Sequence, residues 1–154
     1  MTARERQSEC EILRDAAAHC REAGLRLTAG RELVLSLLAR SLQALKAYDL
    51  LEQMGNPMPP TVYRALDFWL EQGFVHRIES LNAYFACGHP LHAHGCQLLV
   101  CMHCKRVVEV CNHSLNGLFA DTAAANGYCY RKSVLEIHGI CPACQADAAS
   151  GVTL

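Results

Sequence analysis

The fold of the first half of this chain is decided by residues 59–73, which read PPTVYRALDFWLEQG. The two prolines bias the chain away from helix before Thr61, whose hydroxyl can cap a helix that runs to Gly73. Apolar residues recur along this helix at helical spacing, and polar residues occupy the opposite face. The apolar face carries Val62, Leu66, Trp69 and Leu70, and the other face carries Tyr63, Arg64, Asp67 and Glu71.

Shorter helices precede this stretch, and two extended segments follow it. A first helix ends at Gly24, Thr28 caps a second, and a third covers residues 47–54. The chain is then extended over 74–79 and 83–86, with a turn-compatible tripeptide between the two segments. Four helices followed by a hairpin form the winged-helix arrangement of helix-turn-helix proteins. The fourth helix is the predicted recognition helix.

The first turn of that helix carries side chains suited to DNA. Arg64 can read a guanine or hold a phosphate, and Tyr63 can touch a phosphate or a thymine methyl group. The alternative is that both are ordinary surface residues. Acidic and basic residues nearly balance in this half, so DNA binding has to come from a local patch. The predicted contacts are Thr61, Tyr63, Arg64, Arg31 and Arg26, and Arg77 is a further arginine available to the patch.

Composition narrows the class of protein. The 154 residues are 51% apolar and 19% charged, which is typical of a compact globular chain. The formal net charge of −1 gives no overall basic footprint for a nucleic acid. No apolar run approaches the roughly 20 residues that span a bilayer, and the N-terminus shows no secretory signal. The sequence therefore predicts a cytoplasmic protein with no membrane partner.

Metal-ligand residue types are concentrated in the second half. The chain has 10 cysteines and 8 histidines, and most of them lie at or after residue 76. Because a cytosolic compartment keeps thiols reduced, this density indicates metal binding rather than disulfides. Two C-x-x-C pairs, Cys101/Cys104 and Cys141/Cys144, have the spacing of a closed tetrahedral zinc site. The alternative is a pair of buried or redox-active dithiols, although neither pair has the strand-to-helix setting of a thioredoxin-like motif.

The segments around the two pairs predict a small mixed module. Residues 97–100 and 106–110 are expected to be strands, and Asn112 can cap a helix that Gly127 ends. Residues 128–138 are rich in β-formers and lead back to the second cysteine pair. Zinc would then pin the last strand to the first hairpin, which matters in a module with so small a core. The whole chain is therefore predicted to be an α+β protein of two modules.

A second set of ligand types is spread over both modules and the segment that connects them. If residues from both modules bound one ion, metal occupancy would set the angle between the modules. The alternative is that several of these residues are incidental polar groups in a loop. The set comprises His76, Cys87, His89, His92, His94, Cys96, His103, Glu109, Cys111 and His113.

Several segments together resemble the ferric uptake regulator superfamily, and most closely its zinc uptake regulator (Zur) branch. The most specific are PPTVYRAL at 59–66, EQGFVH at 71–76 and the two cysteine pairs, and the similarity covers roughly residues 10–146. The chain departs from the family at Ala29-Gly30, where Pro-Gln is frequent. It also lacks the H-H-D-H run that is common in iron and peroxide sensors, which favours zinc.

The resemblance implies a dimeric, metal-dependent repressor with an N-terminal winged helix and a C-terminal α/β dimerisation domain. The expected divisions are 1–84 for the winged helix, 85–95 for the hinge, 96–146 for the dimerisation domain and 147–154 for the tail. Two zinc ions per chain are implied. The structural ion is held by Cys101, Cys104, Cys141 and Cys144, the regulatory ion by His76, Cys87, His94 and Glu109, and His89, His92 and Cys96 are possible further ligands.

The function implied is zinc-responsive repression of zinc uptake genes by a homodimer on a pseudo-palindromic DNA operator, with no small-molecule substrate. Two alternatives stay open: a regulator of the same superfamily that senses another metal or thiol oxidation, and a zinc-dependent enzyme. A nucleobase deaminase would need H-x-E followed by P-C-x-x-C. Here Ile140 precedes Cys141, and His138 follows Glu136 rather than preceding it, so the expectation is that the chain is not an enzyme.

Overall fold

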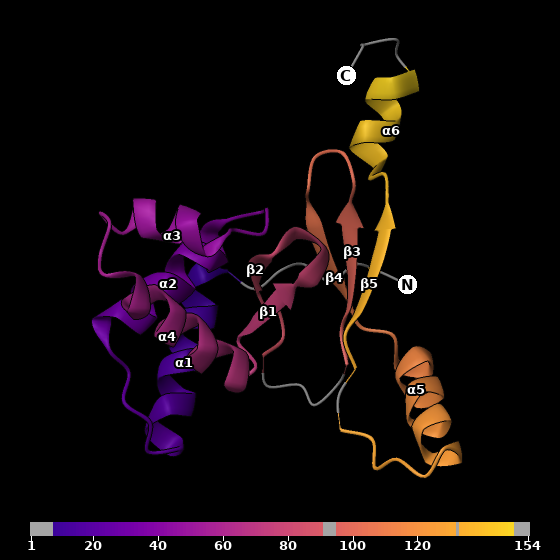
Figure 1. Cartoon of the computed structure of the whole chain (residues 1–154), viewed down its shortest axis with the longest axis horizontal. Helices are drawn as coiled ribbons and strands as arrows, with labels where there is room; N and C mark the ends of the chain where they lie inside the picture. Colours follow the sequence, from indigo (N-terminus) through magenta and orange to yellow (C-terminus); the bar gives the residue numbers. More distant parts are fainter. Residues whose placement is uncertain (1–7, 91–94, 132, 150–154) are drawn as a thin grey trace. The chain divides into compact units, whose positions relative to one another are not determined.

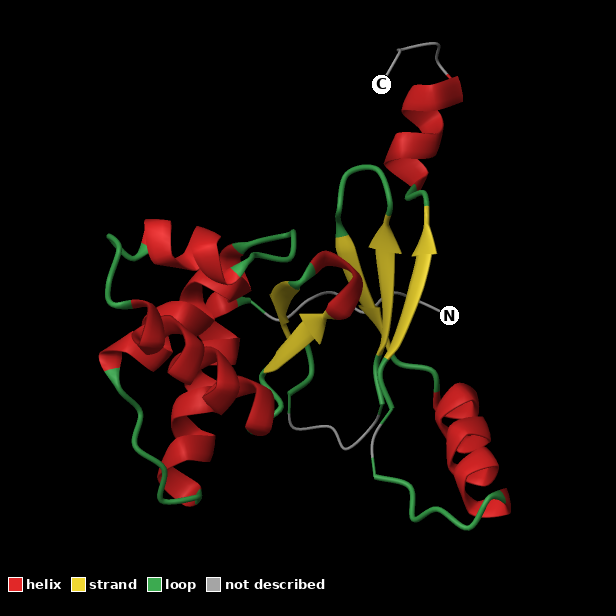
Figure 2. Ribbon diagram, viewed as in Figure 1, coloured by secondary structure: helices red, strands yellow, loops and turns green. Residues whose placement is uncertain are grey.

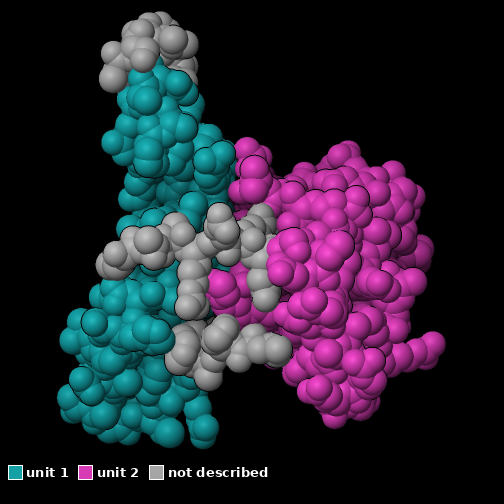
Figure 3. All heavy atoms as spheres, turned by 180° about the vertical axis from the view of Figure 1, so that it is seen from behind, with its two compact units in different colours: residues 1–4, 92–154 teal, residues 5–91 magenta. Residues whose placement is uncertain are grey.

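The computed structural model describes residues 8–90, 95–131 and 133–149 (Figure 1). The chain divides into two compact units, one of residues 5–91 and one of residues 92–154 together with 1–4 (Figure 3). We call them the winged unit and the cysteine unit. The division falls inside the hinge predicted over 85–95. None of the helices in the described ranges is long and apolar enough to cross a membrane.

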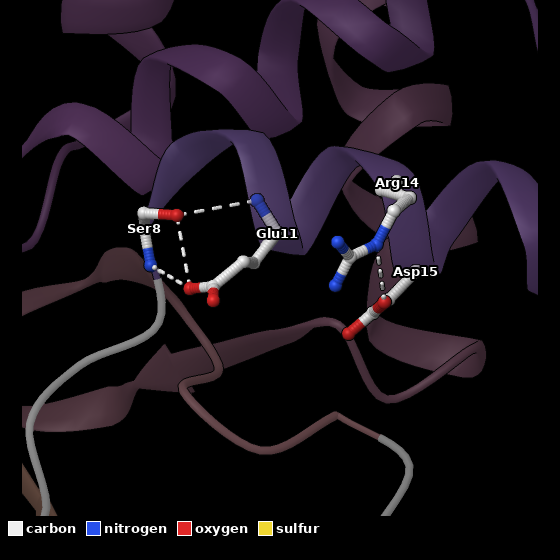
Figure 4. A network of polar contacts seen from close by, with 4 residues as sticks. All are labelled: Ser8, Glu11, Arg14 and Asp15. Carbon is white, nitrogen blue, oxygen red and sulfur yellow. Dashed lines mark hydrogen bonds and ion pairs between the residues drawn. The ribbon is translucent and has the colours of Figure 1, made fainter.

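Four helices make up most of the winged unit (Figure 2). They are α1 (Glu9–Glu22), α2 (Ala29–Arg40), α3 (Ala47–Gln53) and α4 (Pro59–Glu71). A capping box fixes the start of α1, because the Ser8 backbone N–H donates to the Glu11 carboxylate at 2.8 Å and Ser8 Oγ accepts from the Glu11 N–H at 3.4 Å (Figure 4). The predicted cap of α2 is confirmed, since Thr28 Oγ1 accepts from the Arg31 N–H at 3.3 Å.

The start of α4 corrects the sequence prediction. The N-cap is Met58, and Pro59 and Pro60 are the first residues of the helix, so Thr61 does not cap it. The first backbone N–H groups of a helix have no intrahelical partner, and proline's fixed φ suits this position. The prolines therefore begin the helix instead of excluding it.

The core of the winged unit forms where α2 packs against α4 on one side and α1 on the other. Val62, Leu66 and Trp69 of α4 are fully buried there, as the helical spacing predicted. Trp69 also donates its indole N–H to the Arg31 carbonyl at 2.7 Å, which ties α4 to the first turn of α2. The predicted recognition helix, α4, is thus held by packing on one face and by this hydrogen bond near its C-terminal end.

The predicted hairpin is confirmed. Strand β1 (Val75–Ile78) pairs antiparallel with β2 (Ala83–Ala86), and a 3₁₀ turn (Glu79–Leu81) joins them. Asn82 completes the turn with φ of 46°, a left-handed conformation that asparagine tolerates better than most residues. This hairpin is the wing.

In the part that the structure describes, the cysteine unit is a three-stranded sheet with two helices. Strand β3 (Gln97–Cys101) is central; β4 (Val107–Val110) pairs with it antiparallel and β5 (Leu135–Gly139) pairs with it parallel. Helix α5 (His113–Ala125) lies between β4 and β5 in the chain and is capped by Asn112 as predicted. Helix α6 (Pro142–Ala149) follows β5 and was not predicted.

One strand prediction in this unit is too long. Residues 128–138 were expected, as a stretch rich in β-formers, to supply the last strand, but the strand covers only Leu135–Gly139. Of the described residues before this strand, 128–131 and 133–134 belong to no strand. The predicted α+β class, with a winged helix-turn-helix unit and a smaller unit that holds a four-cysteine cluster, is confirmed.

Candidate metal centre and nucleic-acid interface

Four cysteines of the cysteine unit converge on one point. Their sulfurs all lie within 4.8 Å of one another. Parallel pairing places Cys101, the last residue of β3, beside Gly139, the last residue of β5. Met102, which follows Cys101, donates its N–H to the Gly139 carbonyl at 2.8 Å, so both chain ends turn together. The cluster consists of Cys101, Cys104, Cys141 and Cys144.

The spacing of these sulfurs fits zinc. Cys101 Sγ and Cys144 Sγ are 4.0 Å apart, and Cys104 Sγ and Cys141 Sγ are 3.7 Å apart. A tetrahedral ion with Zn–S bonds of about 2.3 Å separates its sulfurs by about 3.8 Å. Four sulfurs with this spacing form a closed, soft donor set, which leaves no open position for catalysis.

Two thiols of the cluster have pKa values shifted in opposite directions. The backbone N–H of Cys141, 3.4 Å from Cys101 Sγ, lowers the pKa of the Cys101 thiol to about 6. The hydrogen bond with the Cys141 side chain is the main cause, and burial the second, of a rise in the pKa of the Cys144 thiol to about 12. The low pKa favours the thiolate form of Cys101, and the raised pKa favours the protonated form of Cys144, so a cation that binds all four sulfurs must displace a proton there.

His103 makes a contact that the sequence did not assign. Its Nδ1 lies 3.5 Å from Cys144 Sγ. His103 lies between the two cysteines of the first pair, so the turn that positions Cys101 and Cys104 also aims the imidazole at the cluster. The C-x-x-C spacing gives no signal for this contact, because it depends on the path of α6.

The second predicted ligand set is represented by one pair in each unit. In the winged unit, His76 on β1 and Cys87 just after β2 are both buried, and their ligand atoms lie within 4.8 Å of each other. The Cys87 N–H donates to the Phe74 carbonyl at 2.8 Å, which continues the wing's pairing and holds the thiol beside the imidazole. A neutral imidazole and a thiolate at this distance are suited to zinc.

In the cysteine unit, Glu109 on β4 lies opposite Leu98 of β3. Its carboxylate is within 4.8 Å of Cys96 Sγ, which makes Cys96, predicted as an extra ligand, the neighbour of Glu109. Of the other predicted ligands, His89 is half-buried in the segment after β2. His92 and His94 lie outside the described residues.

The predicted DNA contacts gather around the starts of two helices. A hollow of about 290 Å³ lies between the N-terminal turns of α2 and α4. Three arginines and the two helix N-termini give it a positive field. Tyr63, 49% exposed, lies in the first turns of α4 beside this hollow's Arg64. The lining residues are Arg26, Thr28, Gly30, Arg31, Thr61, Arg64 and Ala65.

Two arginines of the predicted patch have structural contacts of their own. The Arg31 guanidinium lies 3.6 Å from the centre of the Phe68 ring and donates to the Arg26 carbonyl. Arg77 pairs with Glu79 at 3.3 Å on the wing and does not line the hollow. The sequence missed the role of Phe68, which holds Arg31 against the recognition helix.

A winged helix with a basic hollow, followed by a unit with a closed four-sulfur cluster, defines the class of metal-binding winged-helix regulators. The model of the Ferric uptake regulator family matches residues 22–138, and the chain belongs to this family. Its members are transcription regulators and not enzymes, which agrees with the prediction from sequence.

Within the family, the resemblance to zinc uptake regulators is confirmed. The zinc uptake regulation protein of Escherichia coli (strain K12) is 40% identical over 147 residues, which cover 91% of this chain and 85% of that protein. The structure of a zinc uptake regulator complexed with zinc and DNA is 38% identical, with a TM-score of 0.85 over 93% of this chain and 99% of that one. Holo XcZur is 40% identical, with a TM-score of 0.82 over 88% of this chain and 98% of that one.

Proposed function

We propose that this chain is a zinc-responsive repressor that binds a pseudo-palindromic DNA operator as a homodimer and controls genes for zinc uptake. The observation that carries the proposal is the pairing of His76 with Cys87 in the wing, because it puts zinc-type ligands inside the DNA-reading unit itself. The likeness to zinc uptake regulators supports it. A repressor of this kind works beside the chromosome, in the cytoplasm.

Two zinc ions per chain are part of the proposal. Cys101, Cys104, Cys141 and Cys144 hold the structural ion, and the fit of their sulfur spacing supports this assignment. The regulatory ion has His76, Cys87, His94 and Glu109 as ligands. Imidazoles and a thiolate favour zinc over iron, and the burial of His76 and Cys87 keeps competing water away from the pair.

Zinc supplies a positive charge that joins donor groups from both units. Without it, the units sample several relative orientations, and few dimers present both recognition helices at the spacing of an operator. The ligands converge only in the binding-competent conformation, so ligation selects that conformation. A hundredfold gain in DNA affinity needs only about 2.7 kcal/mol of coupling, and DNA must raise the zinc affinity by the same factor.

The DNA-facing residues of the proposal are Thr61, Tyr63 and Arg64 of α4, with Arg26 and Arg31 at the hollow. Homodimer formation is supported by apolar side chains on the cysteine unit. Leu99, Ile137 and Ile140 are exposed around an apolar hollow of about 250 Å³ on the sheet. A surface of this kind is typical of a subunit interface.

Selection from fragmented genomic DNA tests the proposal, because it finds the operator and the zinc response in one experiment. The protein is loaded with one equivalent of zinc for its cysteine cluster, and fragments are selected with and without added zinc. We expect a few fragments to be enriched only with added zinc, each with an inverted repeat upstream of a gene for metal import. Equal enrichment without added zinc, or enrichment with iron(II) but not zinc, would overturn the zinc response.

A further inference from the structure

We propose that Cys96 and Cys111 form a second, separate thiol centre, a cross-strand dithiol that peroxides oxidise to a disulfide. Cys96 Sγ and Cys111 Sγ lie 3.9 Å apart in the cysteine unit. Neither residue belongs to the four-cysteine cluster. The two thiols are the groups that are modified, and a hydroperoxide is the oxidant.

The strand register explains why these two cysteines meet. Gln97 of β3 is paired with Val110 of β4, so Cys96 and Cys111 come one position beyond the last pair of the ladder. Cross-strand neighbours in an antiparallel ladder have Cβ atoms about 4.5–5.5 Å apart. A disulfide has Cβ atoms about 3.5–4.5 Å apart and an S–S bond of about 2.05 Å, so closing the 3.9 Å gap between the sulfurs needs side-chain rotation and a small approach of the two chain ends.

The backbone at this end of the ladder is held by hydrogen bonds. Gln97 Oε1 accepts from the Asn112 N–H at 2.9 Å, and Gln97 Nε2 donates to the Gly95 carbonyl at 3.1 Å. Gln97 follows Cys96 directly and Asn112 follows Cys111, so one side chain connects the neighbours of both cysteines. Gln97 is itself buried, which keeps solvent from competing for these bonds. The two thiols are thus held close before any oxidation.

The two thiols differ in exposure, and this difference decides which one reacts first with the peroxide. Cys111 is half-exposed, whereas Cys96 is buried. Cys111 Sγ attacks the peroxide oxygen, the O–O bond breaks, and the proton lost by the Cys111 thiol goes to the departing oxygen, so that Cys111 becomes a sulfenic acid and an alcohol or water leaves. Cys96 Sγ then attacks the sulfenic sulfur, the S–O bond breaks, and water leaves with the Cys96 proton. In total two thiols and one hydroperoxide give one disulfide, one alcohol or water, and one water.

Oxidation of Cys96 and Cys111 would affect the proposed zinc ligand Glu109. Cys96 Sγ lies within 4.8 Å of the Glu109 carboxylate, and the new bond turns that sulfur toward Cys111. This step rests on the proposed function, in which Glu109 is a ligand of the regulatory zinc ion. We expect the disulfide to weaken the binding of that ion. A peroxide signal would then relieve repression while the four-cysteine cluster stays intact.

The test uses the full chain loaded with one equivalent of zinc, which protects the four-cysteine cluster. After treatment with hydrogen peroxide, the protein is denatured and alkylated with N-ethylmaleimide, and its intact mass is measured. We expect the native chain to lose two of its 10 alkylation sites and to regain them with a reductant. Trypsin cuts after Lys105 and Arg106, so a Cys96–Cys111 bond joins two peptides that fragmentation can map.

Matched variants make the result specific. Cys111→Ser is expected to lose no sites, whereas Cys129→Ser, which removes an exposed cysteine of the same unit, still loses two. Loss of no sites in the native chain, or an equal loss in Cys111→Ser, would overturn the dithiol assignment. A mapped disulfide with unchanged zinc retention would overturn only the link to zinc. The proposed function is tested independently by the selection of genomic DNA fragments, so either proposal can fail without the other.

Discussion

The two units of this chain are stabilised in different ways. The winged unit buries Leu66, Trp69 and Phe74 completely and has a continuous apolar core. In the cysteine unit, α5 contributes no buried side chain, and Leu98 and Val100 of β3 are among the few buried apolar residues. A unit with so little apolar burial depends on a cross-link. We therefore expect the winged unit to fold by packing alone, and the cysteine unit to depend on the zinc proposed for its four cysteines.

The largest effect is expected from removing one ligand of the four-cysteine cluster. Cys101→Ser should unfold the cysteine unit and leave the winged unit folded, because structural zinc contributes about 10 kcal/mol or more to small domains of this kind. Amide spectra of the full chain distinguish the two units. Cys129→Ser, at an exposed position outside the cluster, is the matched control and should leave both units folded. Native dispersion of all signals in Cys101→Ser would contradict the comparison.

Removing a core side chain should destabilise the winged unit and leave the cysteine unit folded. Trp69→Ala removes a fully buried indole and its hydrogen bond to the Arg31 carbonyl, so we expect the winged unit to lose about 3–5 kcal/mol of its free energy of unfolding. Urea denaturation followed by amide spectra measures this loss. Stoichiometric zinc in the four-cysteine cluster should be retained. Simultaneous loss of both units would show that they fold as one.

A smaller effect is expected on the surface of the winged unit. Arg64→Ala should weaken operator binding by about 1–3 kcal/mol without changing stability, because it removes a charged contact from the hollow and no packing. Fluorescence anisotropy with a selected fragment measures the affinity. Arg14→Ala is the control, since Arg14 is an exposed arginine of α1 that does not line the hollow. Equal affinities for the two variants would remove Arg64 from the interface.

The smallest effect sharpens the account of the cysteine unit. His103→Ala removes the imidazole 3.5 Å from Cys144 Sγ but no ligand, so the unit should stay folded. We expect zinc to bind about tenfold more weakly, as is usual when a partner of a metal ligand is removed. Competition with a chromogenic chelator measures the change. His113→Ala, an exposed histidine at the start of α5, is the control.

Local signals in the sequence predicted most of the fold and the four-cysteine cluster. The cap at Thr28, the hairpin that turns at Asn82 and the C-x-x-C pairs each depend on residues close together in the chain. The start of α4 was placed too late, because proline before a helix and proline within its first turn give the same pattern. The preceding residues offered no cap to decide between them.

Contacts that depend on long-range pairing could not be predicted. The approach of Cys96 to Cys111 requires the register of β3 and β4, and the cysteines' spacing of 15 positions carries no such information. The stacking of Arg31 on Phe68 similarly requires the crossing of α2 and α4. Composition and spacing give the residue types that are present but not the partners that they meet.

The parallel pairing of β5 with β3 sets how far apart the cluster's ligands lie in the chain. Cys101 and Cys144 are separated by 43 positions, so the ion proposed for the cluster would close a large loop that contains α5 and the segment after it. Loop-closure entropy grows only with the logarithm of loop length, and doubling such a loop costs about 0.6 kcal/mol. The segment between α5 and β5 is therefore a site where related chains can gain or lose residues while the ion remains bound.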